Sequence, residues 1–240
     1  MKMLPIILVM LSLSVIAVHQ WHSYSKATIT EISVMQDSTD TLLSEVSADE
    51  IFRQFKLFDK NNDNDWDGAI FRYQTINDVS YNKVIEVSLQ PENFWLGNDI
   101  DRKKKIEEFR ADLFKPFKEK GVGGNKSNSS VYLPIARELT HLSESASTIK
   151  KLLVYSDFME NTYDLSFYNE ETLAMLQSHP DIMIKTLQER LPLPSLIGIE
   201  IHLIYQPDKT ETDRVFRIVS TFYVKMLERK GAKVIVEANI

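Results

Sequence analysis

The chain has 240 residues and a net charge of −6, and 43% of its residues are apolar, 26% charged and 10% aromatic. This mixture can build a hydrophobic core, so it excludes a wholly disordered chain and a protein that crosses a membrane many times. The acidic balance argues against a nucleic-acid-binding body, and the absence of cysteine excludes disulfides, thiolate metal sites and cysteine nucleophiles. The length suits one domain with a short appendage.

The N-terminal segment has the pattern of a targeting sequence. Lys2 is followed by an apolar run over residues 3–18, which is typical of a secretory signal peptide. At ~1.5 Å per residue these residues extend over about 24 Å, short of the ~30 Å hydrocarbon core, which favours a cleaved signal. Trp21 would suit a membrane interface and favours a retained anchor. Both alternatives stay open, and either one places the body outside the cytoplasm: periplasmic, secreted or held at a membrane.

Beyond residues 1–20 the chain alternates predicted strands and helices. Runs of β-branched and aromatic residues predict strands over residues 29–35, 68–76, 83–89, 149–155, 197–204 and 233–237. Helical periodicity predicts helices over residues 41–58, 100–120, 131–142, 170–177, 180–191 and 208–230. Strands separated by helices favour one α/β domain over residues 28–240, with a doubly wound, mainly parallel sheet flanked by helices (Rossmann-like).

Polar side chains stand where such a sheet holds its ligands, beyond the carboxyl ends of the strands. The candidate metal ligands are Asp37, Thr39 and Thr41 after the first strand, Ser129 before a helix, and Asp157 after the buried fourth strand. Two carboxylates and several hydroxyls form an all-oxygen set, which suits Mg²⁺ and also Mn²⁺ or Ca²⁺. So few negative charges leave the ion electron-poor, and it would accept a carboxylate from outside.

These stretches resemble the motifs of a von Willebrand factor A-type domain with a metal-ion-dependent adhesion site. That family carries D-x-S-x-S after its first strand, a Thr or Ser before its third helix, and an Asp after its fourth strand. The matching residues are Asp37, Thr39 and Thr41 for the first motif, Ser129 for the second and Asp157 for the third. The resemblance implies metal-assisted binding of a partner protein, through an acidic side chain of that partner, without catalysis.

The match departs from the family pattern at two places. Phe158 stands where the family has Gly after the last Asp, which would reshape that loop. Ser129, preferred to Ser130 by its spacing to the following apolar pair, is shorter than Thr and would hold the ion more loosely. A degenerate domain that binds partners without metal is therefore an alternative, and so is ordinary helix capping by Asp37 and Ser129.

An enzyme is the third alternative. Haloacid-dehalogenase-like phosphatases place a nucleophilic Asp after the first strand, and Asp37 would be that nucleophile with Mg²⁺ as cofactor. That family also needs a later pair of acidic residues after a strand, whereas residues 205–208 supply only Asp208.

Two charged stretches have other interpretations. Residues 63–68 match the start of a calcium-binding EF-hand loop, but Gln74 stands where a bidentate Glu is needed, so we expect a solvated acidic turn. Residues 101–105 read as a solvated helix start, with weak contact to an anionic surface as the alternative. The sequence leaves the partner and the oligomeric state open.

Overall fold

The described residues of the protein are built around one six-stranded sheet. The computed structural model describes residues 27–37, 46–58, 64–76, 83–118 and 129–238. The strands are β1 (Ile29–Asp37), β2 (Gly68–Ile76), β3 (Val84–Leu89), β4 (Ile149–Tyr155), β5 (Ile199–Ile204) and β6 (Lys233–Glu237). They lie in the order β3-β2-β1-β4-β5-β6, and only the pair β2 and β3 is antiparallel. The predicted α/β fold with a mainly parallel sheet is confirmed.

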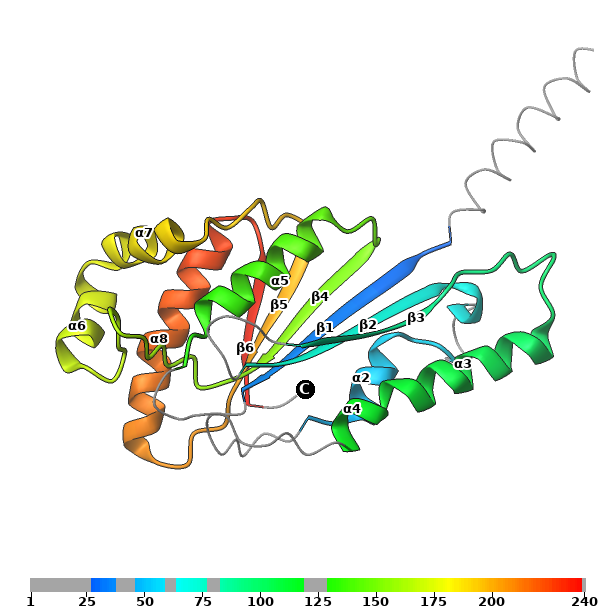
Figure 1. Ribbon diagram of the computed structural model, residues 1–240, viewed down its shortest axis with the longest axis horizontal. Helices are drawn as coiled ribbons and strands as arrows, with labels where there is room; N and C mark the ends of the chain where they lie inside the picture. The colour runs from blue at the N-terminus through cyan, green and yellow to red at the C-terminus, as the bar shows by residue number, and fades with distance from the viewer. Residues whose placement is uncertain (1–26, 38–45, 59–63, 77–82, 119–128, 239–240) are drawn as a thin grey trace, which may run out of the picture.

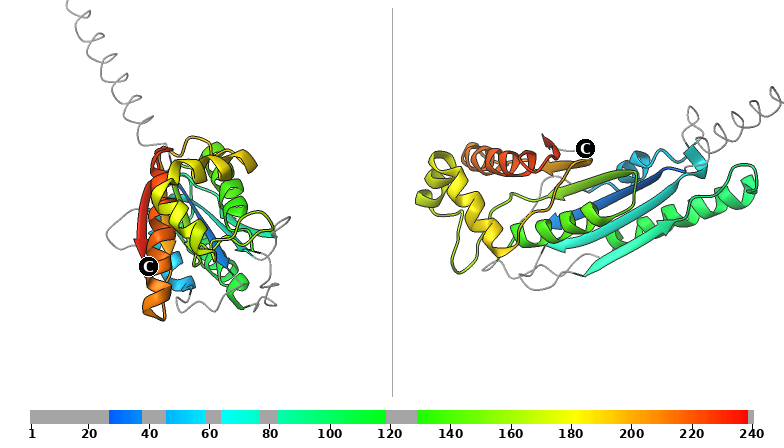
Figure 2. Two further views of the ribbon diagram at one scale, coloured as in Figure 1. Left: turned by 90° about the vertical axis from the view of Figure 1, so that its left-hand side faces the viewer. Right: turned by 90° about the horizontal axis from the view of Figure 1, so that it is seen from above.

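Helices cover both faces of this sheet. They are α2 (Ala48–Gln54), α3 (Asp99–Leu113), α4 (Lys115–Lys118), α5 (Tyr132–Glu144), α6 (Glu170–Ser178), α7 (Pro180–Arg190) and α8 (Thr210–Glu228), with a short 3₁₀ turn, η1 (Asn64–Trp66). The helices α6, α7 and α8 gather at one end of the elongated molecule, and α3 extends along the other end (Figures 1 and 2). No helix within the described ranges is long and apolar enough to cross a membrane.

The two faces have separate hydrophobic cores because side chains alternate along each strand. Ile32 and Val34 of β1 belong to the core beneath α2 and α3, whereas Met35 belongs to the core beneath α5 to α8. On β4 the same alternation places Leu153 in the first core and Val154 in the second. Both central strands therefore contribute side chains to both cores, as expected for strands covered by helices on both faces.

Two predicted helices end earlier than expected. The prediction of a helix over residues 41–58 fails after Gln54, because Lys56 and Phe58 have positive φ values of 57° and 63° and cannot continue a helix; the part over 41–45 lies outside the described residues. The predicted helix 100–120 is divided into α3 and α4. Pro116 has no N–H to bond to the carbonyl of Asp112, so the helix breaks just before it.

A buried polar layer fixes α5 on the sheet. The carboxylate of Glu138 accepts hydrogen bonds from Ser33 Oγ at 2.6 Å, from Arg72 Nε at 2.7 Å and from Gln74 Nε2 at 3.3 Å. Arg72 also pairs with Glu86. Because the charge of Glu138 is compensated inside the protein, the layer holds α5 in one position on β1 and β2. The N-terminus of α5 is thereby fixed relative to the carboxyl end of β1.

A second charge cluster lies across β4, β5 and β6. Glu200 accepts from Lys233 Nζ at 2.6 Å and pairs with His202 Nε2 at 3.0 Å and Lys151 Nζ at 3.2 Å. The hydrogen bonds from Lys233 and His202 lower the pKa of Glu200 to about 2. A carboxyl whose pKa is lower in the folded state stabilises that state above the unfolded pKa and loses this contribution as the pH falls.

This cluster gives a pH-dependence prediction. The difference in free energy of unfolding between the wild type and Glu200→Gln is expected to be constant above about pH 5 and to shrink between about pH 4.5 and pH 2. Urea titrations across this pH range measure it. Glu189→Gln is the control, since Glu189 forms only an exposed helix pair with Lys185 at 3.8 Å among the described contacts. A difference between wild type and Glu200→Gln that stays constant down to pH 2 would contradict the prediction.

Candidate functional site

The strand order reverses between β1 and β4, where open α/β sheets bind their ligands. Asp37 is the last residue of β1, and Ser156 directly follows β4. The two strands are paired up to Gln36 and Tyr155, and Figure 1 shows them ending side by side. Ser156 Oγ donates a hydrogen bond to Asp37 Oδ2 at 2.8 Å, and Asp37 is only 3% exposed. The first and third of the predicted stretches are therefore in direct contact.

The loop after β4 holds Asp157 in a tight turn. Asp157 Oδ1 accepts from the N–H of Met159 at 2.9 Å, and Ser156 Oγ accepts from the N–H of Phe158 at 2.9 Å. Phe158 has a φ of 61°, in the left-handed region that favours glycine. Its ring is fully buried against Tyr223, with the ring centroids 5.3 Å apart. The backbone thus adopts a conformation suited to glycine although the residue is Phe.

Ser129 is tied to the same loop through its backbone. Its N–H donates to the carbonyl of Asn161 at 2.9 Å, and its carbonyl accepts from the N–H of Asn161 at 2.8 Å. The Ser129 hydroxyl is buried and makes no hydrogen bond with any residue in the described ranges, so it does not bond to the carboxylate of Asp37 or of Asp157. An unsatisfied buried hydroxyl costs about 1–3 kcal/mol, which a bound ligand would remove. The neighbouring Ser130 hydroxyl is already used, since it donates to Glu160 at 3.1 Å.

Sequence reasoning missed Glu160, which binds the N-terminus of α5. Its fully buried carboxylate accepts from the N–H groups of Val131 and Tyr132 at 2.8 and 2.9 Å, and it pairs with Arg190 Nη1 at 3.2 Å. Burial raises the pKa of Glu160, although the two N–H groups, Ser130 and Arg190 act in the opposite direction. The positive end of the helix dipole favours a carboxylate here.

Capping of α5 by Ser129, one of the alternatives, is wrong. The N-cap position of α5 is Val131, which makes no side-chain hydrogen bond to the helix, and Glu160 takes the capping role from another loop.

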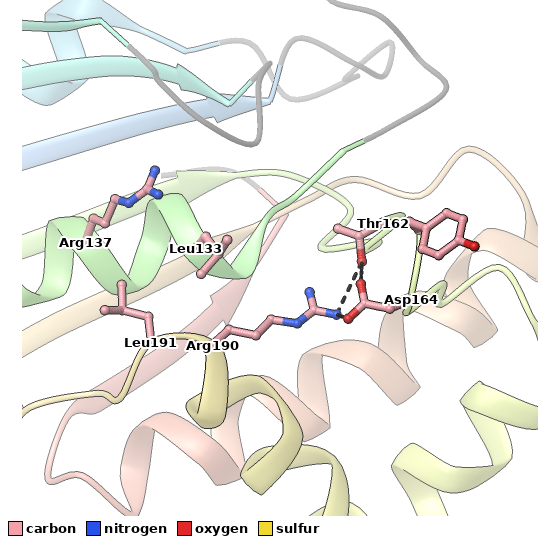
Figure 3. A pocket seen from close by; sticks show the side chains of 7 residues that line it. Leu133, Arg137, Thr162, Asp164, Arg190 and Leu191 are labelled. Atoms are coloured by element: carbon pink, nitrogen blue, oxygen red, sulfur yellow. Dashed lines mark hydrogen bonds and ion pairs between the residues drawn. The ribbon is translucent and has the colours of Figure 1, made fainter.

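A pocket of about 560 Å³ lies beside this loop (Figure 3). Its lining residues are Leu133, Arg137, Thr162, Tyr163, Asp164, Arg190 and Leu191. Arg190 Nη2 lies 2.8 Å from Asp164 Oδ2 and 3.3 Å from Thr162 Oγ1, so the charge of this guanidinium is compensated by neighbours in the pocket wall. Asp37 does not line the pocket. The open space therefore lies next to the carboxyl edge of the sheet rather than at Asp37 itself.

The EF-hand-like turn (residues 63–68) packs around the positively charged side chain of Arg102. The guanidinium of Arg102 is fully buried and donates to the carbonyl oxygens of Asp65 and Asp67. The carboxylates of these two residues accept from the N–H groups of Phe58 and Thr28. The expectation of a solvated turn is therefore wrong on one side, where the buried guanidinium of Arg102 binds the backbone carbonyl oxygens of the turn. A buried positive charge on these carbonyls disfavours Ca²⁺; Asp63 lies outside the described residues.

Thr39 and Thr41 also lie outside the described residues, so their position relative to Asp37 stays a prediction. Within the described ranges no group of three or more His, Cys, Asp or Glu could hold a metal ion. A site made of two carboxylates and several hydroxyls would not form such a group. No protein-family model matches this chain, and no curated protein sequence matches it.

Proposed function

We propose that the protein is an exported or membrane-anchored VWFA-like domain that binds a protein partner through a divalent cation at the carboxyl edge of its sheet. Asp37, Ser129 and Asp157 of the described chain, together with Thr39 and Thr41, would hold the ion. The observation that carries the proposal is the unsatisfied buried hydroxyl of Ser129, fixed to the loop that bonds to Asp37.

The chemistry of these residues fits a hard divalent ion. Carboxylate and hydroxyl oxygens are the ligands that Mg²⁺ and Mn²⁺ accept, and hydroxyl ligands leave the ion electron-poor. Ser156 orients Asp37 through a hydrogen bond, as groups beyond the direct ligands do in metal sites. Glu160 and Asn161 fix the position of Ser129. A bound ion would supply an open coordination position for a carboxylate of the partner.

Calorimetric titration with Mn²⁺ tests the metal site. Wild-type protein is expected to bind one ion, and Asp37→Ala is expected to weaken binding at least about 100-fold, because a charged ligand is lost. Ser129→Ala is expected to weaken binding while stabilising the apo protein, since it removes a buried unsatisfied hydroxyl. Asp112→Asn is the control, because Asp112 is a half-buried residue near the end of α3, away from the proposed site, and pairs with Lys115 of α4. Circular dichroism checks that each variant folds.

Three outcomes separate the alternatives. A flat titration of the wild type would favour a domain that binds partners without metal. Asp37-dependent release of phosphate from a generic phosphate ester in the presence of Mg²⁺ would favour the phosphatase. Binding of a partner that persists in excess chelator would contradict the cation-mediated interaction.

A further inference from the structure

A cluster of exposed apolar side chains lies at the opposite edge of the sheet from Asp37. It consists of Phe94, Trp95, Leu96 and Ile100, which are 58%, 76%, 87% and 78% exposed, and we call it the apolar tip. The tip occupies the connection between β3 and α3 and the first turn of α3. Contiguous exposed apolar groups of this size are unusual on soluble proteins and mark sites of interaction.

Local contacts hold the backbone of the apolar tip in a defined turn. The carbonyl of Asn93 accepts from the N–H groups of Leu96 and Gly97, and the side chain of Asn98 caps α3. The rings of Trp66 and Phe94 meet edge to face with centroids 5.7 Å apart. A side chain at position 97 would collide with the ring of Trp66, so the turn needs Gly97. A well-packed turn therefore keeps these apolar side chains exposed to water. Such an arrangement suits a surface that contacts another molecule.

The tip lies next to the point where the chain enters the sheet. The N–H of Thr28, the residue before β1, donates to Asp67 Oδ1 at 3.0 Å, and the N–H of Glu92 donates to the carbonyl of Trp66 at 3.0 Å. Figure 1 shows the start of β1 and the β3–α3 connection at the same end of the molecule. The apolar run of the predicted signal or anchor segment (residues 1–20) ends at Val18, ten residues before Thr28. Ten residues span at most about 35 Å, so a segment held in a bilayer would keep the tip close to that bilayer.

The charges around the tip do not favour binding to an anionic membrane surface. Lys103 pairs with Asp99 at 2.7 Å, Lys105 with Glu92 at 3.0 Å and Lys104 with Glu108 at 3.7 Å. The basic run of the sequence is thus neutralised by its neighbours, and Arg102 is buried. Any attraction of the tip to a membrane comes from its apolar and aromatic side chains, and Trp is a residue that prefers the membrane interface.

We infer that the apolar tip inserts into the interface of a lipid bilayer as a second contact beside a retained N-terminal anchor. Insertion would hold the amino edge of the sheet against the membrane. The nine residues of β1 separate this edge from Asp37 by about 30 Å. The carboxyl edge would then face away from the lipid, accessible to a partner. This inference does not depend on whether the carboxyl edge binds a cation.

Spin labelling of the full chain tests the inference. The chain has no cysteine, so Leu96→Cys and Tyr163→Cys each provide a single thiol for a nitroxide. Both positions are exposed, and Tyr163 lies on the loop at the carboxyl edge. In vesicles of pure phosphatidylcholine, the accessibility of label 96 to a water-soluble nickel complex is expected to fall about tenfold, whereas label 163 stays accessible. Adding Trp95→Ser to the Leu96→Cys chain is expected to shift insertion about tenfold toward water, or about 1.4 kcal/mol.

Three results would overturn the inference. Equal access of the nickel complex to labels 96 and 163 in vesicles would mean that the tip stays in water. Protection of label 96 only with phosphatidylserine vesicles would indicate an electrostatic contact. Protection without vesicles that rises with protein concentration would identify a second copy of the chain as the occupant.

Discussion

Glu160→Ala is expected to lower the free energy of unfolding by about 3–5 kcal/mol, because it removes one partner of a buried ion pair. The substitution leaves the N–H groups of Val131 and Tyr132 without their acceptor, and Arg190 loses one of its two carboxylate partners. It also frees the loop that is paired with Ser129. Urea unfolding followed by circular dichroism measures the change.

Two matched variants separate the charge of Glu160 from its shape. Glu160→Gln keeps an acceptor oxygen but not the charge, so it is expected to retain part of the lost stability. Ser130→Ala removes one hydrogen bond to the same carboxylate and is expected to cost about 1 kcal/mol. If Glu160→Ala costs less than Ser130→Ala, the carboxylate does not hold the helix N-terminus in the way described.

Arg102→Leu is the second large effect that we expect. The guanidinium donates to the carbonyl oxygens of Asp65, Asp67 and Gln90 and pairs with Glu92 at 3.2 Å. Leucine fills part of the space but leaves three carbonyl groups without a donor, so a loss of about 3–5 kcal/mol follows. Arg102→Lys is expected to recover little, since one ammonium group cannot reach the same set of oxygens.

The control for Arg102 is its neighbour Lys104. Lys104 is exposed and pairs with Glu108 at 3.7 Å, so Lys104→Met is expected to change the free energy of unfolding by less than about 0.5 kcal/mol. Unfolding by urea gives both values. Equal effects of Arg102→Leu and Lys104→Met would show that the buried guanidinium has no special role in joining the turn at η1 to α3.

The strands were the most predictable part of the fold. Residues 68–76, 149–155 and 233–237 were predicted with the observed bounds, because these strands are short runs rich in β-branched and apolar residues with clear ends. The helix predicted over 41–58 was too long because apolar spacing alone does not show that Lys56 and Phe58 adopt positive φ values. Local turn conformations of this kind depend on tertiary contacts that periodicity does not contain.

The candidate site was predictable only where it follows from strand ends. Asp37 and Asp157 follow parallel strands, so topology brings their stretches together without knowledge of side-chain contacts. Glu160 and Arg102 were not predicted, because each acts on backbone groups far away in the sequence: Glu160 on Val131, and Arg102 on Asp65. Arg102 also stands in a run of charged residues, which made it look solvated. No local pattern distinguishes such a residue from its exposed neighbours.

The left-handed backbone of Phe158 has a mechanical consequence. A bulky residue in this conformation stores about 1–3 kcal/mol, which the surrounding packing must offset. Here the offset comes from the ring, which packs in tilted contacts against Phe216 and Tyr223 of α8. The turn that carries Asp157 therefore cannot relax to an ordinary conformation without withdrawing an aromatic ring from α8. A displacement of this loop at the carboxyl edge would therefore also disturb the packing of α8, which holds the Phe158 ring.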